Sequence, residues 1–123
     1  MALANEPVDL VIHEKARFYQ KFIWKDSGGT PIDLTGYKAH MQIRESANSD
    51  TALLTLSTET MTKDGTITLG GAAGTIELEI LASVLDTIPW RTGTYDLLMY
   101  TDADHADVLV AGRIRVEKIN TRV

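Results

Sequence analysis

The sequence predicts an all-β domain, and two observations lead to that prediction. Apolar and polar residues alternate along several segments, most clearly over residues 37–44, 75–81 and 94–100. Because side chains of a strand point to opposite faces in turn, each segment has one side for a core and one for solvent. Turns rich in glycine and aspartate separate these segments, as in an antiparallel fold. The chain of 123 residues is long enough for one such domain.

The first half of the chain contains four of the predicted strands. Residues 1–7 are expected to form an extended arm. Residues 26–30 form a turn, because adjacent glycines adopt positive φ at no steric cost. Residues 31–34 continue as a short extended piece that Pro31 restricts to a sheet edge or a late start, since proline has no N–H to donate. A turn is predicted within residues 31–37, where Asp33 can bond its neighbouring backbone and Gly36 permits the bend. Strands are predicted over residues 8–13, 16–24, 37–44 and 52–57.

The second half contains the other four strands and one helical turn. Residues 63–65 and 70–74 are predicted turns, and residues 102–105 form the turn of a closing hairpin. The helical turn is predicted over residues 83–88, where Ser83 is a suitable N-cap and Pro89 ends it. Strands are predicted over residues 66–69, 75–81, 94–100 and 107–119.

Together these segments predict a single antiparallel β-sandwich of about eight strands. The pattern does not fix the strand order, so the sandwich can be immunoglobulin-like or jelly-roll-like. Phe18, Phe22 and Trp24 share one face of their strand and are expected in the core, with the Trp24 indole N–H seeking a partner. We expect an N-terminal arm over residues 1–7 and the sandwich domain over residues 8–123.

Composition excludes several classes of function. The net charge is −5 and the longest local run of basic character is only Arg113 with Arg115, two residues that share a strand face, so we expect no nucleic-acid partner. The chain has no cysteine, which excludes disulfides and thiol chemistry and fits assembly in a reducing cytoplasm. No apolar run approaches the ~20 residues that span a bilayer, and the N-terminus does not have the pattern of a signal peptide, so we expect no membrane partner.

The densest acidic cluster comprises Asp102, Asp104 and Asp107, next to His105. Its carboxylates could bind calcium, although the spacing lacks the glycine and the distal glutamate of an EF-hand loop. The favoured interpretation is a hairpin tip, where aspartate stabilises the turn and solubility.

Other patterns give no catalytic set. The glycines of residues 70–74 lack the Lys-Ser/Thr of a phosphate loop, and His13, His40 and His105 are far apart with no nucleophile elbow. Glu77 and Glu79 share a strand face about 7 Å apart, the spacing of an inverting glycosidase, but glutamates on a strand face are far more often simple solvated positions. We therefore predict no enzyme activity, no catalytic residue, no cofactor and no metal site.

Two segments are predicted to contact partners. Trp90 and Arg91 stand side by side in a loop, the residue types that interface cores favour, although local packing over a sheet edge is the alternative. The N-terminal arm, with Leu3, Asn5 and Glu6, is the second candidate.

Several motifs, taken in order, resemble a known family. They are Trp24-Lys25-Asp26, residues 29–37, residues 41–44, residues 54–58, residues 74–78, Tyr95-Asp96-Leu97 and the last strand with Gly112. This series, from about Phe18 to the end, resembles small β-sandwich structural proteins of tailed bacteriophages, of the capsid cement or collar and tail-fibre attachment type.

The resemblance implies a virion protein without enzymatic activity, assembled in the host cytoplasm and often trimeric. The leading hypothesis is a capsid decoration protein that binds the major capsid protein as a homotrimer and stabilises the lattice. The first alternative is a tail, collar or fibre-attachment adaptor that contacts other virion proteins. The second is a carbohydrate-binding module, which would need Tyr19, Trp90 and Tyr100 on one sheet face.

Overall fold

The structure is a computed structural model that describes residues 7–58, 64–86 and 88–121. The described chain is almost entirely β-structure. The strands are β1 (Leu10–His13), β2 (Phe18–Ile23), β3 (Lys38–Arg44), β4 (Ala52–Ser57), β5 (Gly65–Leu69), β6 (Thr75–Ile80), β7 (Thr92–Tyr100) and β8 (Ala106–Glu117). The predicted strands are confirmed within about two residues at nearly every boundary, which is the usual uncertainty of strand ends.

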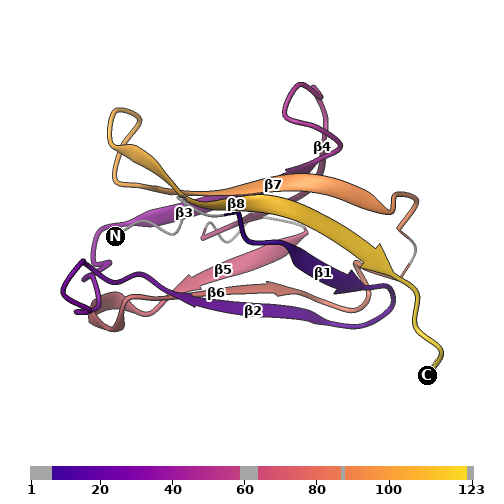
Figure 1. Cartoon of the computed structure of the whole chain (residues 1–123), viewed down its shortest axis with the longest axis horizontal. Coiled ribbons are helices and arrows are strands. Elements are labelled where there is room, and N and C mark those ends of the chain that lie inside the picture. The colour runs from indigo at the N-terminus through magenta and orange to yellow at the C-terminus, as the bar shows by residue number, and fades with distance from the viewer. Residues whose placement is uncertain (1–6, 59–63, 87, 122–123) are drawn as a thin grey trace.

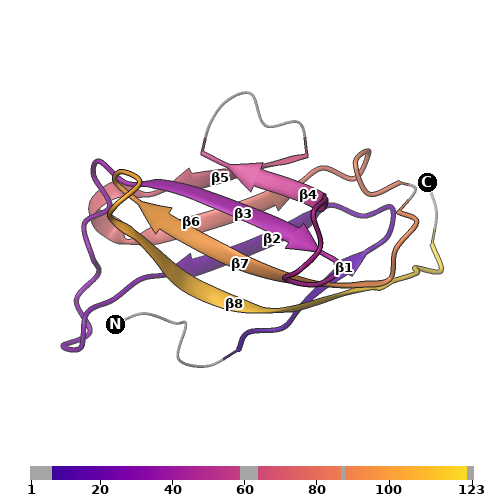
Figure 2. The same cartoon turned by 90° about the horizontal axis from the view of Figure 1, so that it is seen from above.

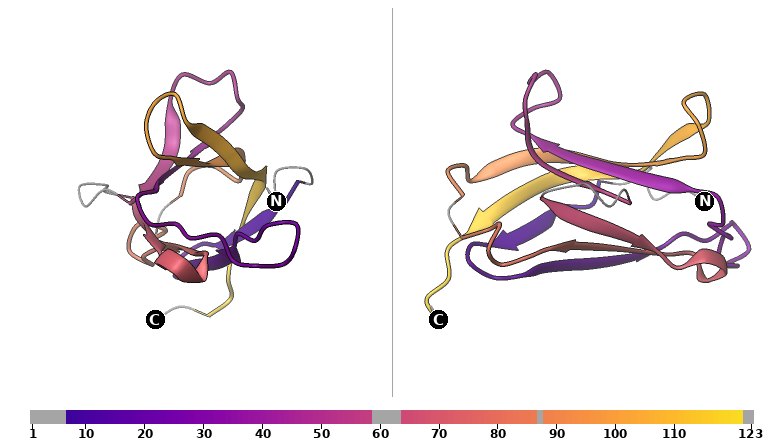
Figure 3. Two further views of the ribbon diagram at one scale, coloured as in Figure 1. Left: turned by 90° about the vertical axis from the view of Figure 1, so that its left-hand side faces the viewer. Right: turned by 180° about the vertical axis from the view of Figure 1, so that it is seen from behind.

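The eight strands form one sheet that folds over itself into two layers. Their order is β1-β8-β7-β3-β4-β5-β6-β2. One layer contains β8, β7 and β3, the other contains β5, β6 and β2, and the sheet bends between β4 and β5 (Figure 1; Figure 2). Viewed along the strands, the layers enclose a nearly closed ring (Figure 3, left). This arrangement confirms the predicted all-β sandwich.

Two pairings depart from the expected antiparallel pattern. β1 pairs with β8 in parallel, and β4 pairs with β5 in parallel through a short register of Leu56 with Gly65 and Ser57 with Thr66. Alternation along a strand reports which face is buried and carries no information on the direction of the neighbouring strand. The remaining pairings are antiparallel.

The core lies between the two layers and follows the alternation of the sequence. In β3, Ala39, Met41 and Ile43 are fully buried while the residues between them reach the surface. Their counterparts in the opposite layer, such as Ile76 and Leu78 of β6, are also fully buried. Facing sheets that interdigitate in this way stabilise a sandwich by removing apolar area from water, about 25 cal/mol per Å².

The segment between β2 and β3 is extended but irregular, as Pro31 predicts. Lys25 and Pro31 form an isolated antiparallel bridge, and the Leu34 N–H donates to the Gly71 carbonyl oxygen over 3.0 Å. The predicted turn that follows is confirmed, because the Thr35 N–H donates to Asp33 Oδ1 over 3.0 Å and Gly36 has a φ of 86°.

The predicted helical turn over residues 83–88 is wrong. The chain there makes two successive turns, in which Val84 N–H donates to Leu81 and Leu85 N–H to Ala82, and the described residues continue without a helix. Tertiary burial overrides the local capping signal, since Leu85 and Ile88 point into the end of the core. A short 3₁₀ turn, η2 (Gly71–Ala73), occurs instead in the glycine-rich connection from β5 to β6.

Candidate docking surfaces

The outward side chains of β8, β7 and β3 form cross-strand rows that we call the outer face. The register of β7 with β3 and with β8 defines the rows. From one end to the other they are Arg115–Thr92, Arg113–Thr94–Arg44, Ala111–Asp96–Gln42, Val108–Leu98–His40 and Ala106–Tyr100–Lys38.

Two loops rise above this face at opposite ends. The loop from β3 to β4 rises beyond Arg44, and the tip of the β7–β8 hairpin rises beyond Tyr100 (Figure 1; Figure 3, right). Arg44 braces the first loop, because its Nη1 donates to the Ser49 carbonyl oxygen over 2.9 Å and its Nη2 to Gln42 Oε1 over 2.7 Å. The outer face is therefore a saddle between two raised ends.

A hollow of about 420 Å³ lies in the saddle on the Arg44 side. Its floor is made of small or short side chains, Thr94, Ala111 and Gly112, and Ala47 of the β3–β4 loop forms part of its wall. The hollow is open to solvent, and one carboxylate, Asp96, is among the residues that line it. This is the shape of a contact surface and not of an enclosed catalytic pocket.

The rows differ in chemistry. Val108 is 41% exposed and Leu98 is half-buried, so the row with His40 is an apolar stripe across a polar face. Arg44 and Arg113 make the end beside the hollow basic, and among the described residues the Arg113 guanidinium has no ion-pair partner. The hairpin tip at the other end contains Asp102 and Asp104 and is acidic.

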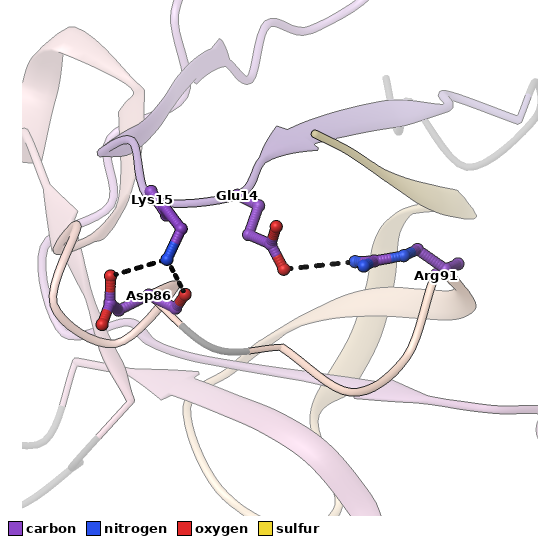
Figure 4. Close-up of polar contacts among 4 residues, drawn as sticks. All are labelled: Glu14, Lys15, Asp86 and Arg91. Carbon is purple, nitrogen blue, oxygen red and sulfur yellow. Dashed lines mark hydrogen bonds and ion pairs between the residues drawn. The ribbon is translucent and has the colours of Figure 1, made fainter. Parts of the chain in front are cut away.

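A second cluster lies at the opposite end of the sandwich from the hairpin tip (Figure 4). Lys15 Nζ contacts the Asp86 carbonyl oxygen over 3.0 Å and Asp86 Oδ1 over 3.3 Å. Arg91 Nη1 donates to Glu14 Oε2 over 3.3 Å. The two pairs join the β1–β2 turn to the chain that precedes β7. All four groups are used internally, so the cluster ties two connections together.

The predicted partner-contact residues fall in different places. Trp90 is half-buried and packs against the core, and Arg91 is exposed and paired with Glu14. Leu3, Asn5 and Glu6 lie outside the described residues. The structure therefore places Trp90 as the packing alternative requires, and the contact role of both segments stays a prediction.

The outer face is the surface that reading the sequence missed. A signal was present, because Leu98 is an apolar residue in the polar register of its strand. Leu109, an extra residue opposite Leu97 and Leu98, forms a bulge and lets Val108 point outward. The two residues meet only through the pairing of β7 with β8, which alternation alone does not reveal.

The glutamates that matched a glycosidase spacing are each occupied by a neighbour. The Tyr19 hydroxyl donates to Glu77 Oε1 over 2.6 Å, and Arg17 Nε donates to Glu79 Oε2. Both lie on the outward side of β6, and the same contact with Glu77 raises the pKa of Tyr19.

The acidic hairpin tip uses Asp102 to build its own turn. Asp102 Oδ1 accepts hydrogen bonds from the backbone N–H of Asp104 and His105, and lies 2.8 Å from His105 Nδ1. The His105 side chain and these backbone donors lower the pKa of Asp102. Within residues 7–58, 64–86 and 88–121, no three acidic or histidine side chains are grouped as metal ligands.

Comparison with known proteins identifies the fold. No protein-family model matches the chain, and no curated protein matches its sequence. The structure of NK cell receptor Nkp44, a triggering partner in natural cytotoxicity, superposes with a TM-score of 0.54 at 18% identity, over 93% of this chain and 99% of that chain. The ZIG-8–RIG-5 IG1-IG1 heterodimer, in its monoclinic form, gives 0.52 at 10% identity, over 94% and 86%.

The fold is immunoglobulin-like. The sequence left an immunoglobulin-like and a jelly-roll-like sandwich open, and the structure is the immunoglobulin-like one. Identities of 10% and 18% are too low to transfer a function, so these immunoglobulin-like neighbours establish the architecture alone. No helix in the described part of this domain is long and apolar enough to cross a membrane.

Proposed function

We propose that this immunoglobulin-like domain is a non-enzymatic structural protein of a bacteriophage virion that acts by docking onto other proteins. The observation that supports docking is the apolar stripe on the outer face. Interfaces combine an apolar centre with a polar rim, and Val108 and Leu98 form such a centre between charged ends.

The virion role is supported by the ordered motifs that resemble phage β-sandwich proteins, from Trp24 to Gly112. A net charge of −5 suits that role, because an acidic domain is repelled by packaged nucleic acid. The leading placement is on the capsid, where the protein would bridge neighbouring subunits of the major capsid protein. Contacts of about 1,600 Å² per partner pair would stabilise the closed lattice against rupture.

The carbohydrate-binding alternative finds less support. A sugar platform stacks several aromatic rings on one surface. Tyr19 lies on β2 in one layer and Tyr100 on β7 in the other, so the two rings face opposite sides of the domain. Trp90 is half-buried in a connection between the layers.

Counting copies in purified particles tests the virion role and its placement. Quantitative mass spectrometry of gradient-purified phage is expected to find on the order of hundreds of copies of the protein per particle, in keeping with a closed icosahedral lattice. About a dozen copies or fewer would place it instead in a ring at the tail or collar. Particles that lack it altogether would contradict the virion role.

Heating the particles tests the stabilising mechanism. Particles that lack the protein are expected to release DNA at a lower temperature than complete ones, because binding to the closed lattice shifts its stability by mass action. Adding the purified protein back should restore the release temperature. Identical release profiles with and without the protein would contradict a cement function.

A further inference from the structure

The outer face is complementary to itself in charge. Its row Arg113–Thr94–Arg44 is basic, and the row Val108–Leu98–His40 has two apolar side chains beside a histidine. Asp96 lies between these two rows, and Lys38 lies between the second row and the hairpin tip, which contains Asp102 and Asp104. The apolar row lies between the basic row and the acidic tip. When a second copy is turned end over end and faces the first, the basic row of each copy meets the acidic tip of the other.

We propose that the outer face is a contact between two copies of this chain, related by a twofold axis that runs along the row Val108–Leu98–His40. Side chains of that row then pack against the same side chains of the other copy, as the symmetry of such a dimer requires. The basic row of each copy meets the hairpin tip of the other, so Arg113 faces Asp104.

The charges also select this axis over the other face-to-face arrangement. A twofold axis parallel to the strands would set β8 of one copy over β3 of the other, placing Arg113 against Arg44 and one acidic tip against the other. Like charges brought together in this way disfavour that arrangement. An axis across the strands replaces both repulsions with attractions.

Shape supports the same arrangement. The hairpin tip projects above the face at one end, and the hollow of about 420 Å³ lies toward the other (Figure 3, right). With the axis along the apolar row, each raised tip enters the hollow of its partner. The short floor residues Thr94, Ala111 and Gly112 leave room for it.

The contact area between the two copies indicates how stable the dimer is. About the axis, the four rows from Arg113–Thr94–Arg44 to Ala106–Tyr100–Lys38 overlap together with the hairpin tip of each copy, over about 27 Å by 14 Å at 3.4 Å per residue and 4.8 Å between strands. Counted flat, two such faces give about 800 Å², below the ~1,200 Å² of a stable interface. The dimer is therefore expected to be weak and transient.

The inference deepens the proposed docking role by naming a second copy as one occupant of the face, but it does not depend on a virion. Self-association is measured on the pure protein, and the virion role is measured by copies in particles. Either can fail alone. A trimer, which the phage resemblance implies, is a separate outcome of the same measurement.

Sedimentation velocity of the pure protein tests the contact. From about 10 μM to about 1 mM, the weight-average mass should rise from 13.5 kDa toward twice that value. Val108→Glu places two carboxylates together at the axis and should leave a monomer throughout. Thr68→Glu adds the same charge on the exposed side of β5, in the other layer, and should associate like the parent. Circular dichroism verifies that both variants fold.

A charge swap tests the arrangement of the two copies. Arg113→Glu and Asp104→Arg should each weaken association at least about tenfold, and the double variant should recover to within about threefold of the parent. A parent that stays monomeric at about 1 mM, a mass that rises to a trimer, or a double variant weaker than both single variants would overturn the proposal.

Discussion

At the scale of single residues, Tyr95 ties the middle of β7 to the start of the domain. Its side chain is 4% exposed, and its hydroxyl donates to the Val8 carbonyl oxygen over 2.6 Å. Burial raises the pKa of the Tyr95 phenol, and the nearby Asp9 carboxylate raises that pKa further. The folded state therefore holds the Tyr95 proton more tightly than the unfolded chain does.

That shift predicts a loss of stability in alkali. Below the unfolded pKa of about 10, Tyr95 is neutral in both states and its contribution is complete. As pH rises from there toward the folded value, the tyrosine of the unfolded chain ionises and the contribution is progressively lost. Tyr95→Phe should cost about 1 kcal/mol of unfolding free energy at pH 8 through the missing hydrogen bond. The variant should then lose less stability than the parent between pH 8 and 11. Urea unfolding at both pH values measures this, and equal losses would contradict it.

Lys15 adopts a backbone conformation that disfavours it. Its φ of 70° is the left-handed region, which costs a residue with a Cβ about 1 kcal/mol or more. Its ammonium group pairs with Asp86, whose side chain is largely in solvent although Lys15 is half-buried, and a pair exposed on one side contributes little. Lys15→Gly should therefore be about 1 kcal/mol more stable than Lys15→Ala, since both lose the pair and only glycine relieves the strain. A urea titration in which the alanine variant is the more stable would refute this.

At the scale of secondary-structure elements, the sequence pattern predicted the features that depend on residues close in sequence. The strand over residues 52–57 was predicted with the observed bounds, and the turn at residues 33–36 was predicted from Asp33 and Gly36. Both depend on neighbours in sequence, through alternation and turn chemistry. The parallel pairing of β4 with β5 depends on contacts across the fold, and no residue in either strand signals it.

The same limit applies to the outer face and to the wrong helical turn. Leu98 and Val108 are ten positions apart, and only the register of β7 with β8, including the bulge at Leu109, makes them neighbours. In residues 83–88 the sequence offers a cap and a stop, yet burial of Leu85 decides the backbone. The sequence therefore predicted the strands but not the outer face that their pairing assembles.

The segment from β6 to β7 covers one end of the core. Its buried residues therefore contribute to the free energy of unfolding, although its described residues form no helix or strand. Leu85 is fully buried there, whereas Leu81, four residues earlier, is 57% exposed. Leu85→Ala should destabilise the domain by about 2–5 kcal/mol, the cost of a buried leucine and its cavity. Leu81→Ala, the matched control, should change stability by no more than about 0.5 kcal/mol. Thermal and urea unfolding of both variants measure the contrast, and similar losses would contradict a closing role.

At the scale of the whole molecule, the two layers form one folding unit. Residues of β3 and β7 from one layer and of β2, β5 and β6 from the other belong to a single buried cluster. The connections reinforce it at both ends, since the Lys15 N–H donates to the Leu85 carbonyl oxygen and the Leu34 N–H to that of Gly71. Neither layer has a core of its own, so neither should survive alone.

The two tryptophans make this cooperativity measurable. Trp24 lies beside the β5–β6 turn, where its backbone N–H donates to the Gly74 carbonyl oxygen. Trp90 lies at the other end of the sandwich, next to Arg91 (Figure 4). Trp24→Phe leaves Trp90 as the only indole, and Trp90→Phe leaves Trp24. Among the described residues the buried Trp24 indole N–H has no hydrogen-bond partner, in contrast to the expectation from sequence, so its replacement by phenylalanine costs core packing but no hydrogen bond.

In each variant, urea unfolding followed by tryptophan fluorescence should coincide with unfolding followed by far-ultraviolet circular dichroism. Coincident curves are the signature of a two-state transition, which a shared core imposes on a domain of this size. The comparison is made within each variant, so a small change in stability from the substitution does not disturb it. A fluorescence midpoint that precedes the dichroism midpoint for Trp24 alone, or for Trp90 alone, would show that one end opens independently and that the layers are not one unit.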